Sequence, residues 1–391
     1  MKVALYTIFR CTNYGAVLQA YALARTLRGL DGYDVDVLNH RMDPRDNHLL
    51  GKITNPNTPW FQRWRNRRKF AARYVRPDLF EVRRQNMIRF IDEQIRPTGR
   101  LYLRPQEFRD MPRYDVVVVG SDQVWNPSLN HDFGCNQYLC ENFPDAQERV
   151  AYGASFGVSE LPPECEGRYR NALSRFKAIT VREETGAEIC AELLPPGKGR
   201  PRVVLDPTML LTADDWRAAV RGAQSADSGD AGSSAGGIAA YWVRTPTQDD
   251  VAALARMAGK RGETVRLMSA GPMPKLDFPA EVVPCIDAAP FDFVSNIADA
   301  SAAVTDSFHG LQFAVTFKRP FVAVGDLSDA KSNASRLVDF CARYGLSGGV
   351  CDIGSFRSNE ACRFEDFSGF NAAALAADRE RSMQTLREML P

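Results

Sequence analysis

The segment TDSFHG at 305–310 places a carboxylate, a hydroxyl, an imidazole and a glycine directly after an apolar strand predicted at 302–305. Open parallel sheets bind ligands at the carboxyl ends of their strands. A helix that begins here presents free N–H groups to an anion, with Ser307 as its cap and Gly310 letting a phosphate approach the backbone. His309 would then bind that anion as a charged hydrogen-bond donor, or act as a proton donor.

The same segment also has a structural interpretation. Asp306 and Ser307 are good helix caps, and a histidine in the first turn of a helix can simply be a packed surface residue. These residue types alone leave both the anion-binding and the structural interpretation open. The polar residues that follow other predicted strands help to decide between them.

The turn after the apolar strand at 3–9 is polar and small. It holds Asn13, Tyr14 and Gly15, with Gln19 one helical turn later. Such amide and hydroxyl groups suit sugar hydroxyls, which need paired donors and acceptors. Turn geometry alone also favours Asn and Gly, which is the structural alternative.

The apolar strand at 114–119 leads into a second polar turn. Asp122, Gln123 and Trp125 follow it, and a carboxylate, an amide and an indole together suit a sugar, with the ring stacked on an apolar sugar face. A tryptophan buried in a packed loop is the alternative.

Two arginines can supply positive charge. Arg182 follows the strand at 178–181, and its guanidinium can bind a carboxylate or a phosphate through two parallel hydrogen bonds, although a surface pair with a neighbouring glutamate fits equally well. Arg336 ends the segment 331–336 and could add a phosphate ligand, unless that segment only caps the helix expected at 337–344.

Strands and helices alternate along the chain, which predicts two parallel-sheet α/β domains with a cleft between them. The strand at 3–9, the helix at 16–30 and the strand at 35–38 form one right-handed βαβ unit. The run GAQSADSGDAGSSAGG at 222–237 can bury little and predicts a flexible connection. The expected parts are an N-terminal domain at 1–215, a glycine-rich linker at 216–237, a C-terminal domain at 238–370 and a C-terminal helix at 371–391.

The composition excludes several classes of protein. Lys and Arg total 49 against 48 Asp and Glu, so a net charge of +1 gives no broad basic field for nucleic acid. The nine cysteines are scattered without a C-x-x-C pair and only four histidines occur, which favours a reduced, disulfide-free, metal-free cytoplasmic protein. No apolar run approaches the ~18–20 residues that cross a bilayer.

The segment 60–76 is an exception to this neutral composition. It carries seven Arg or Lys and five aromatic residues in seventeen positions. Basic aromatic helices bind anionic membrane surfaces, here the inner face of a membrane, and the same mixture can bind nucleic acid. A solvated helix that packs its tryptophans inward is the alternative that we favour from the sequence.

The chain resembles the polysaccharide pyruvyl transferase family in six short segments that occur in the order typical of that family. Any one of them is a weak signal, whereas six in order, ending in S-x-H-G, are specific. They are NYGAVLQAYAL at 13–23, VGSDQVWNP at 119–127, AYGASFG at 151–157, VREE at 181–184, LDPT at 205–208 and TDSFHG at 305–310.

This resemblance implies two Rossmann-like domains in a GT-B-like arrangement, the first binding the acceptor and the second the donor. It implies phosphoenolpyruvate as donor substrate, a sugar of a surface polysaccharide or a lipid-linked oligosaccharide as acceptor, and a pyruvate ketal as product. Arg182 and His309 fall where members of the family hold the carboxylate and phosphate of the donor. No cofactor or metal is expected, because fixed cations can supply the same electrostatic stabilisation.

Such a reaction needs cations for two anionic groups, an acid for the methylene carbon and a base for the sugar hydroxyl. His309 would bind phosphate or serve as the acid. Asp122 is the expected base, and Asp306 is the alternative.

Two other functions compete. A GT-B-type nucleotide-sugar glycosyltransferase shares the fold but needs a nucleoside pocket, usually with a carboxylate for the ribose, and no acidic residue follows His309 in the first turns of that helix. A non-catalytic carbohydrate-binding or scaffold protein would not need Arg182, Asp122 and His309 together.

Overall fold

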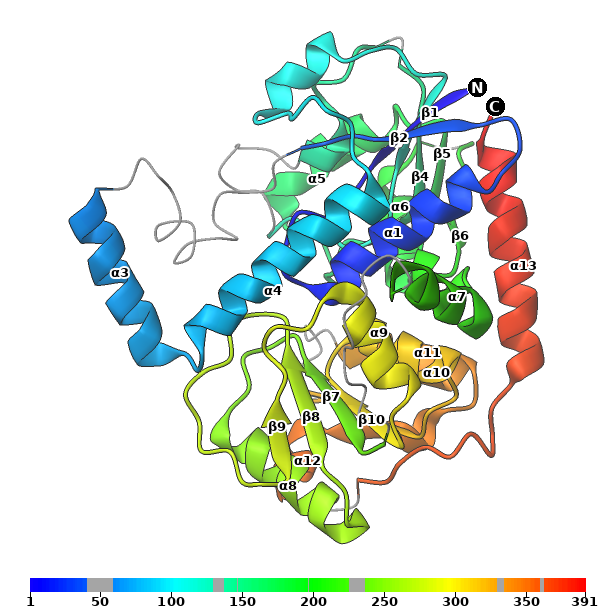
Figure 1. Cartoon of the computed structure of the whole chain (residues 1–391). Coiled ribbons are helices and arrows are strands. Elements are labelled where there is room, and N and C mark those ends of the chain that lie inside the picture. The colour runs from blue at the N-terminus through cyan, green and yellow to red at the C-terminus, as the bar shows by residue number, and fades with distance from the viewer. Residues whose placement is uncertain are drawn as a thin grey trace.

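A computed structural model describes residues 1–40, 59–128, 137–145, 147–195, 197–224, 236–328, 334–358 and 362–391. The described residues form two six-stranded sheets, one from each half of the chain (Figure 1). Every strand pair within both sheets is parallel. The prediction of two Rossmann-like domains in a GT-B-like arrangement is therefore confirmed.

The first sheet has the strand order β2-β1-β3-β4-β5-β6. Its strands are short and mostly buried on both faces, as expected when helices cover both sides of a parallel sheet. They are β1 Lys2–Tyr6, β2 Asp34–Val37, β3 Val116–Val119, β4 Arg149–Ala154, β5 Ala178–Val181 and β6 Arg202–Val203.

The second sheet has the order β12-β11-β10-β7-β8-β9, so its central strand β10 is the one that leads into the 305–310 segment. Its strands are β7 Ile238–Trp242, β8 Val265–Ser269, β9 Val282–Pro284, β10 Ala302–Thr305, β11 Phe321–Gly325 and β12 Val350–Asp352.

Helices follow most strands and cover the sheets. Those of the first half are α1 Tyr14–Arg28, α3 Trp60–Arg73, α4 Pro77–Phe90, α5 Pro163–Leu173, α6 Glu184–Leu193 and α7 Ala213–Gln224. Those of the second half are α8 Gln248–Arg261, α9 Pro290–Ala298, α10 Phe308–Thr316, α11 Ala334–Arg343, α12 Ile353–Ser358 and α13 Ala372–Met389. In the described part of the chain, none is long and apolar enough to cross a bilayer.

One hydrophobic core joins the two domains. Successive side chains of a strand point to opposite faces, so Leu5 packs in this shared core while Tyr6 packs in a separate core beneath α5 and α6. The shared core contains α1 from the first domain and α9 and α10 from the second. The cleft between the sheets therefore has a packed floor, which fixes the two rows of strand ends relative to each other.

The connection between the domains differs from the predicted linker at 216–237. The prediction is wrong for its first part, because 213–224 form α7. Trp216 is fully buried there, packs beside Phe313 and donates from Nε1 to the carbonyl of Thr208 at 3.0 Å, which explains why this segment is helical. Residues 225–235 of the predicted linker lie outside the described residues.

The C-terminal helix α13 returns to the first domain and brings the two chain ends together (Figure 1). Ser382 accepts the backbone N–H of Leu205 at 2.9 Å, just beyond β6. Tyr33 donates to the carbonyl of Pro391 at 2.9 Å. The edge strand β6 is thus covered by α13.

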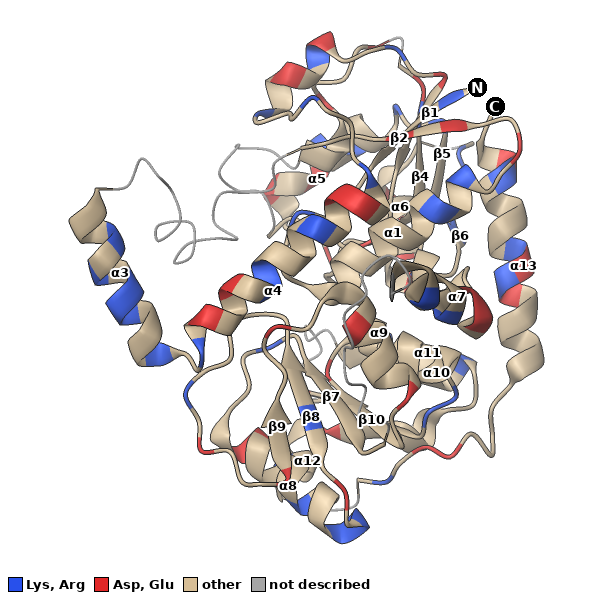
Figure 2. Ribbon diagram, in the orientation of Figure 1, with Lys and Arg blue, Asp and Glu red and all other residues tan. Residues whose placement is uncertain are grey.

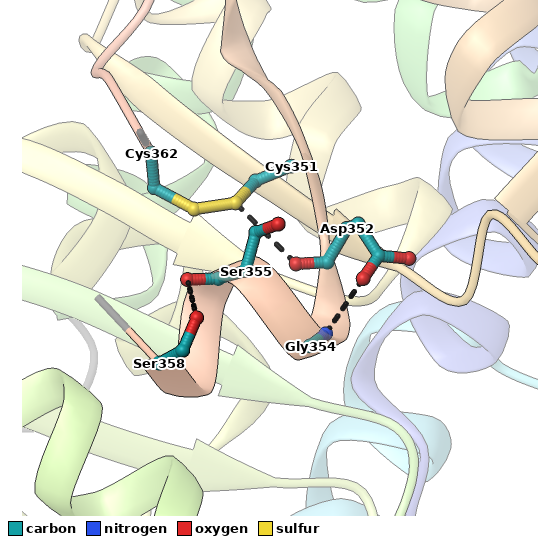
Figure 3. Close-up of a disulfide and its surroundings, with 6 residues drawn as sticks. All are labelled: Cys351, Asp352, Gly354, Ser355, Ser358 and Cys362. Atoms are coloured by element: carbon teal, nitrogen blue, oxygen red, sulfur yellow. Dashed lines mark hydrogen bonds between the residues drawn. A yellow bond between two sulfur atoms is a disulfide. The ribbon is translucent and has the colours of Figure 1, made fainter. Parts of the chain in front are cut away.

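The expectation of a disulfide-free chain is wrong at one pair, because Cys351 and Cys362 form a disulfide (Figure 3). Their Cα atoms are 5.7 Å apart, a separation that a disulfide spans. The pair connects β12 to the segment that returns beside β11, where Phe321 and Glu365 form an antiparallel bridge. This tertiary contact is invisible in the spacing of the cysteines.

Candidate active site

A cavity of ≈ 370 Å³ lies between the carboxyl ends of strands from both sheets. It brings together eight of the residues singled out in the sequence, which come from segments more than three hundred positions apart. They are Asn13, Asp122, Gln123, Arg182, Asp306, Ser307, His309 and Arg336. A second cavity of ≈ 310 Å³ beside β5, β6 and α13 contains none of them.

His309 is held in the first turn of α10 by a tightly packed strand end. Ser307 is the cap and accepts the N–H of Gly310 at 3.2 Å, while Thr305 Oγ1 accepts the N–H of Ser307 at 3.0 Å. A Cβ atom at Gly310 would collide with Thr305 Oγ1, so this glycine permits close packing of the turn and does not line the cavity. The backbone N–H groups of Phe308 and His309 begin the helix, where N–H groups lack intrahelical acceptors.

Asp206 connects this turn to the first domain. Its Oδ2 atom lies 2.8 Å from Arg182 Nη1 and 3.4 Å from His309 Nε2, and Oδ1 accepts the N–H of Thr208 at 3.0 Å. Burial alone would raise the pKa of Asp206, but the His309 and Arg182 charges and the hydrogen bonds hold that pKa well below its usual range. Asp206 is therefore a fixed, buried anion that orients the imidazole.

Arg182 is fully buried and surrounded by carboxylates. Besides Asp206, its guanidinium lies 3.4 Å from Asp122 and 3.5 Å from Glu183. Burial would lower the pKa of Arg182, but these carboxylates raise it above its usual value. The expected free fork for a ligand carboxylate is therefore not what the structure places here, because the two terminal nitrogens already face Asp206 and Asp122.

Arg336 is the second arginine of the cavity wall. Its guanidinium lies 5.7 Å from the centre of the Phe308 ring, and that of Arg182 lies 5.4 Å from the same centre. Burial and the nearby charge of Arg182 both lower the pKa of Arg336. Because this environment disfavours its positive charge, an anion in the cavity would relieve the electrostatic cost.

Asp306 is a cavity carboxyl whose pKa is raised by its surroundings. Burial raises the pKa of Asp306 to about 6. The backbone N–H groups of Val243 and Arg244 and the charge of Arg244 act in the opposite direction. Its two oxygens accept the backbone N–H of Val243 at 2.6 Å and that of Arg244 at 3.2 Å, which ties β10 to β7. A carboxyl that gains or loses a proton near neutral pH is suited to acid–base chemistry.

Arg244 was not singled out from the sequence, although it lines the cavity. Its Nε lies 3.2 Å from Asp306, and its terminal nitrogens bind Asp250 at 2.6 and 2.8 Å. Its position two residues beyond β7 resembles that of Arg182 just beyond β5. Arg244 could therefore have been predicted from the sequence, because it lies just after the end of a predicted strand.

Asp122 has an unusual backbone conformation for a residue with a side chain. Its φ is 70°, in the left-handed region, and its carbonyl accepts the N–H of Ser155 at 3.0 Å. Such conformations occur in turns and cluster at functional sites, and aspartate tolerates them better than most residues. The turn presents Asp122 and Gln123 to the cavity.

Three predicted acceptor-binding residues are packed elsewhere, so that part of the prediction is wrong. Gln19 is buried and donates to Ile8 O and Ala16 O, both at 2.9 Å. Tyr14 donates across the domain boundary to Ala288 O at 2.8 Å, and Trp125 donates from Nε1 to Tyr138 O at 3.3 Å. The donor groups of all three side chains are thus used by backbone carbonyls, as is usual for buried polar groups.

Gly15 does not line the cavity but controls access to His309. A Cβ atom built at this position would overlap the imidazole around Nδ1. Because Nε2 faces Asp206, Nδ1 is the ring nitrogen left for a ligand, and a side chain at position 15 would overlap it. Asn13 caps α1 above this contact by accepting the N–H of Gly15 at 3.0 Å.

Among the residues that the structure describes, no group of three or more His, Cys, Asp or Glu side chains is placed to hold a metal ion. The chemical groups that the cavity does offer are arginines, carboxyls, one imidazole and a helix start. This set suits an anionic ligand that takes part in proton transfer.

Comparison with known proteins gives one family. The model of polysaccharide pyruvyl transferase matches residues 13–328. No curated protein matches the chain significantly.

The chain is also similar to solved structures, all at low sequence identity. UDP-GlcNAc 2-epimerase from Neisseria meningitidis is 10% identical with a TM-score of 0.46, over 100% of this chain and 99% of that chain. The glycosyltransferase SnogD from Streptomyces nogalater is 14% identical with a TM-score of 0.40, over 100% and 96%. E. coli ADP-heptose lps heptosyltransferase II is 13% identical with a TM-score of 0.36, over 100% and 98%.

Proposed function

The chain belongs to the polysaccharide pyruvyl transferase family, and we propose that it moves the pyruvyl group of phosphoenolpyruvate onto a sugar. The acceptor would be a surface polysaccharide or its lipid-linked precursor, and the product a pyruvate ketal. The observation that carries the proposal is His309, oriented by the buried Asp206 at the wall of a cavity shared by both domains.

The donor has a phosphate and a carboxylate on one vinyl carbon, so the site needs at least two positive centres. The start of α10 and Arg336 line the cavity and can supply them, whereas the guanidinium of Arg182 already faces three carboxylates. Arg182 then acts mainly by fixing Asp206 and Asp122. A donor anion close to Asp306 would raise its pKa further and so reduce the negative charge facing the ligand.

The reaction can be written with named groups. His309 protonates the methylene carbon, which becomes the methyl group, while Asp122 accepts the proton of a sugar hydroxyl as its oxygen bonds to the former vinyl carbon. The oxygen of a second hydroxyl of the same sugar then bonds to that carbon as the bond from the carbon to the phosphate oxygen breaks, and the proton of this hydroxyl passes to the departing inorganic phosphate. Asp306 is the alternative base for either hydroxyl.

Donor binding tests this proposal directly. Isothermal titration of phosphoenolpyruvate into the full chain should show saturable binding, and Arg336→Gln should weaken it about tenfold or more, because a charge-assisted hydrogen bond is lost. Arg221→Gln, on the exposed side of α7, removes the same charge away from the cavity and should leave binding unchanged.

The same titration can also contradict the proposal. No binding of phosphoenolpyruvate together with saturable binding of a nucleotide sugar would move the function to glycosyl transfer. Binding of neither ligand, even with sugar acceptors present, would favour a non-catalytic carbohydrate-binding protein.

Gly15→Ala tests whether an open Nδ1 of His309 matters. The added methyl group should displace or cover the imidazole and lower kcat/KM at least about tenfold, whereas alanine in a helix is intrinsically favourable by roughly 1 kcal/mol. Gly259→Ala is the matched control, because Gly259 lies in α8 with nothing near its Cβ position. Unchanged turnover in Gly15→Ala would contradict this role for Nδ1.

A further inference from the structure

Helix α3 projects from the body of the molecule beside the junction of the two domains (Figure 1). The expectation that its tryptophans pack inward is wrong. Trp60 is 75% exposed, Phe61 51% and Trp64 56%, whereas Phe70 is the one buried side chain of the helix. Large aromatic side chains at this level of exposure, three within five positions, are costly in water unless another surface covers them.

The charges of α3 all have one sign. Its fourteen residues include no Asp or Glu, and Figure 2 shows blue without red along this ribbon. The basic residues are Arg63, Arg65, Arg67, Arg68, Lys69 and Arg73. Since the whole chain carries a net charge of only +1, this positive charge is local to the helix.

The aromatic and basic groups lie on one surface. At 100° per residue, Trp60, Trp64 and Arg67 lie within one narrow stripe of the helix, with Phe61 and Arg68 at its side. The Arg68 guanidinium lies 4.8 Å from the centre of the Trp64 ring. Aromatic rings bordered by arginines match the boundary between lipid headgroups and acyl chains, where rings enter the apolar layer and guanidinium groups bind phosphates.

We propose that α3 binds the surface of a bilayer that contains anionic lipid. The aromatic stripe, which we call the α3 face (Trp60, Phe61, Trp64, Arg67 and Arg68), inserts at headgroup depth, and the remaining cations of the helix add electrostatic attraction. A single-stranded nucleic acid would also use both the charges and the exposed rings, so its binding is measured as a competing outcome of the test below.

The attachment of α3 gives this binding a consequence for the cavity. Its end is fixed to the second domain, where Val75 donates to Met273 O and Lys275 donates to Arg73 O, both at 2.9 Å. The following helix α4 carries the buried Arg83, whose guanidinium binds Ser269 O of the second domain and Thr12 O of the first, and Thr12 directly precedes Asn13 of the cavity wall. Bilayer binding would therefore hold the cleft close to lipid headgroups.

A cleft held near the bilayer suits a lipid-linked acceptor, and this part of the inference rests on the proposed function. The binding of α3 to the bilayer does not rest on it. A protein that binds vesicles but not phosphoenolpyruvate would keep the membrane inference and lose the proposed donor, so the two failures are distinguishable.

Co-sedimentation of the full chain tests the inference, with vesicles of phosphatidylcholine alone and of phosphatidylcholine mixed with phosphatidylglycerol. Binding is expected only to the mixed vesicles. The triple variant Arg65→Gln, Arg67→Gln and Arg68→Gln should weaken it about a hundredfold, at about fivefold per charge. The double variant Trp60→Ser and Trp64→Ser should weaken it at least about tenfold through lost apolar burial.

Matched variants control for net charge and for exposed apolar area. Arginines 104, 109 and 113 of the first domain are also exposed, and changing all three to Gln removes the same charge from a segment outside α3. Leu101→Ser and Leu103→Ser remove exposed apolar side chains there. Neither control should alter vesicle binding.

Three outcomes would overturn the inference. They are equal binding to vesicles without phosphatidylglycerol, equal losses in the control variants, and binding of single-stranded DNA at concentrations where the mixed vesicles do not bind. Because the altered side chains are exposed, thermal unfolding should be unchanged in every variant, and a loss of binding then reports on the surface.

Discussion

Replacing His309 by Ala is expected to lower kcat by about 10²–10⁴-fold, because the methylene carbon of the donor would lose its proton donor. His309 is the only imidazole at the cavity in the described residues, and it is fixed between Asp206 and Gly15. A water molecule in place of the imidazole would not be held in a fixed orientation, and it would be a weaker acid. The measurement is phosphate release under saturating donor and acceptor.

The split between kcat and donor affinity separates the two roles that the sequence leaves open for His309. A proton donor affects kcat with little change in the dissociation constant of phosphoenolpyruvate, whereas a phosphate ligand mainly weakens donor binding. Titration calorimetry on His309→Ala supplies the second number. Near-wild-type kcat with weakened binding would exclude proton transfer by His309.

His40 provides a matched control for this variant. It is also buried, but it lies beneath the first sheet and binds Leu38 O and Tyr138 OH at 2.9 and 2.8 Å. His40→Ala should lower stability through these lost contacts and leave kcat of the folded protein unchanged. An equal loss of kcat in both variants would mean that the His309 effect reports folding and not chemistry.

The strand ends explain how much of the site the sequence could predict. The apolar strands of both sheets are recognisable because parallel strands are buried on both faces, and residues just beyond them must gather along one edge. Asp122, Arg182 and His309 were found in this way, and the cavity joins all three. The six ordered segments added the family, which the family model confirms.

The partners of those residues depend on packing and were not predictable in the same way. Asp206 was recognised only as part of the segment LDPT, because nothing in its spacing from Arg182 or His309 shows that three strand ends meet there. Conversely, Gln19 and Trp125 have residue types that suit a sugar, yet both are buried. Residue type indicates what a side chain can bind, whereas burial decides what reaches it.

Asp206→Asn is expected to lower the free energy of unfolding by about 3–5 kcal/mol, because removing the charge of one member of a buried ion cluster leaves its cationic partners less well compensated. Asn keeps the shape and can still accept the N–H of Thr208, so the loss reports the charge facing Arg182 and His309. Denaturant unfolding measures it. Asp78→Asn, which breaks an exposed pair with Arg76, should change little.

The pH dependence of the unfolding free energy tests the charge of Asp206 in a second way. Because the folded protein holds the pKa of Asp206 below that of the unfolded chain, its contribution is present above the unfolded pKa of about 4 and is lost as pH falls below that value. The difference in stability between the wild type and Asp206→Asn should therefore be full at neutral pH and shrink in acid. A difference that stays constant down to acid pH would show that shape, and not charge, is what Asn fails to replace.

A double-mutant cycle then identifies which partner the charge serves. Adding Arg182→Met to Asp206→Asn removes the guanidinium that has lost its nearest carboxylate, so the double variant should be more stable than the sum of the two single losses predicts. Strictly additive losses would mean that Asp206 stabilises the fold through Thr208 and Ser121 instead. In the expected case, the ion pair that orients His309 also joins the first domain to the helix start of the second, so loss of this pair should lower turnover and stability together.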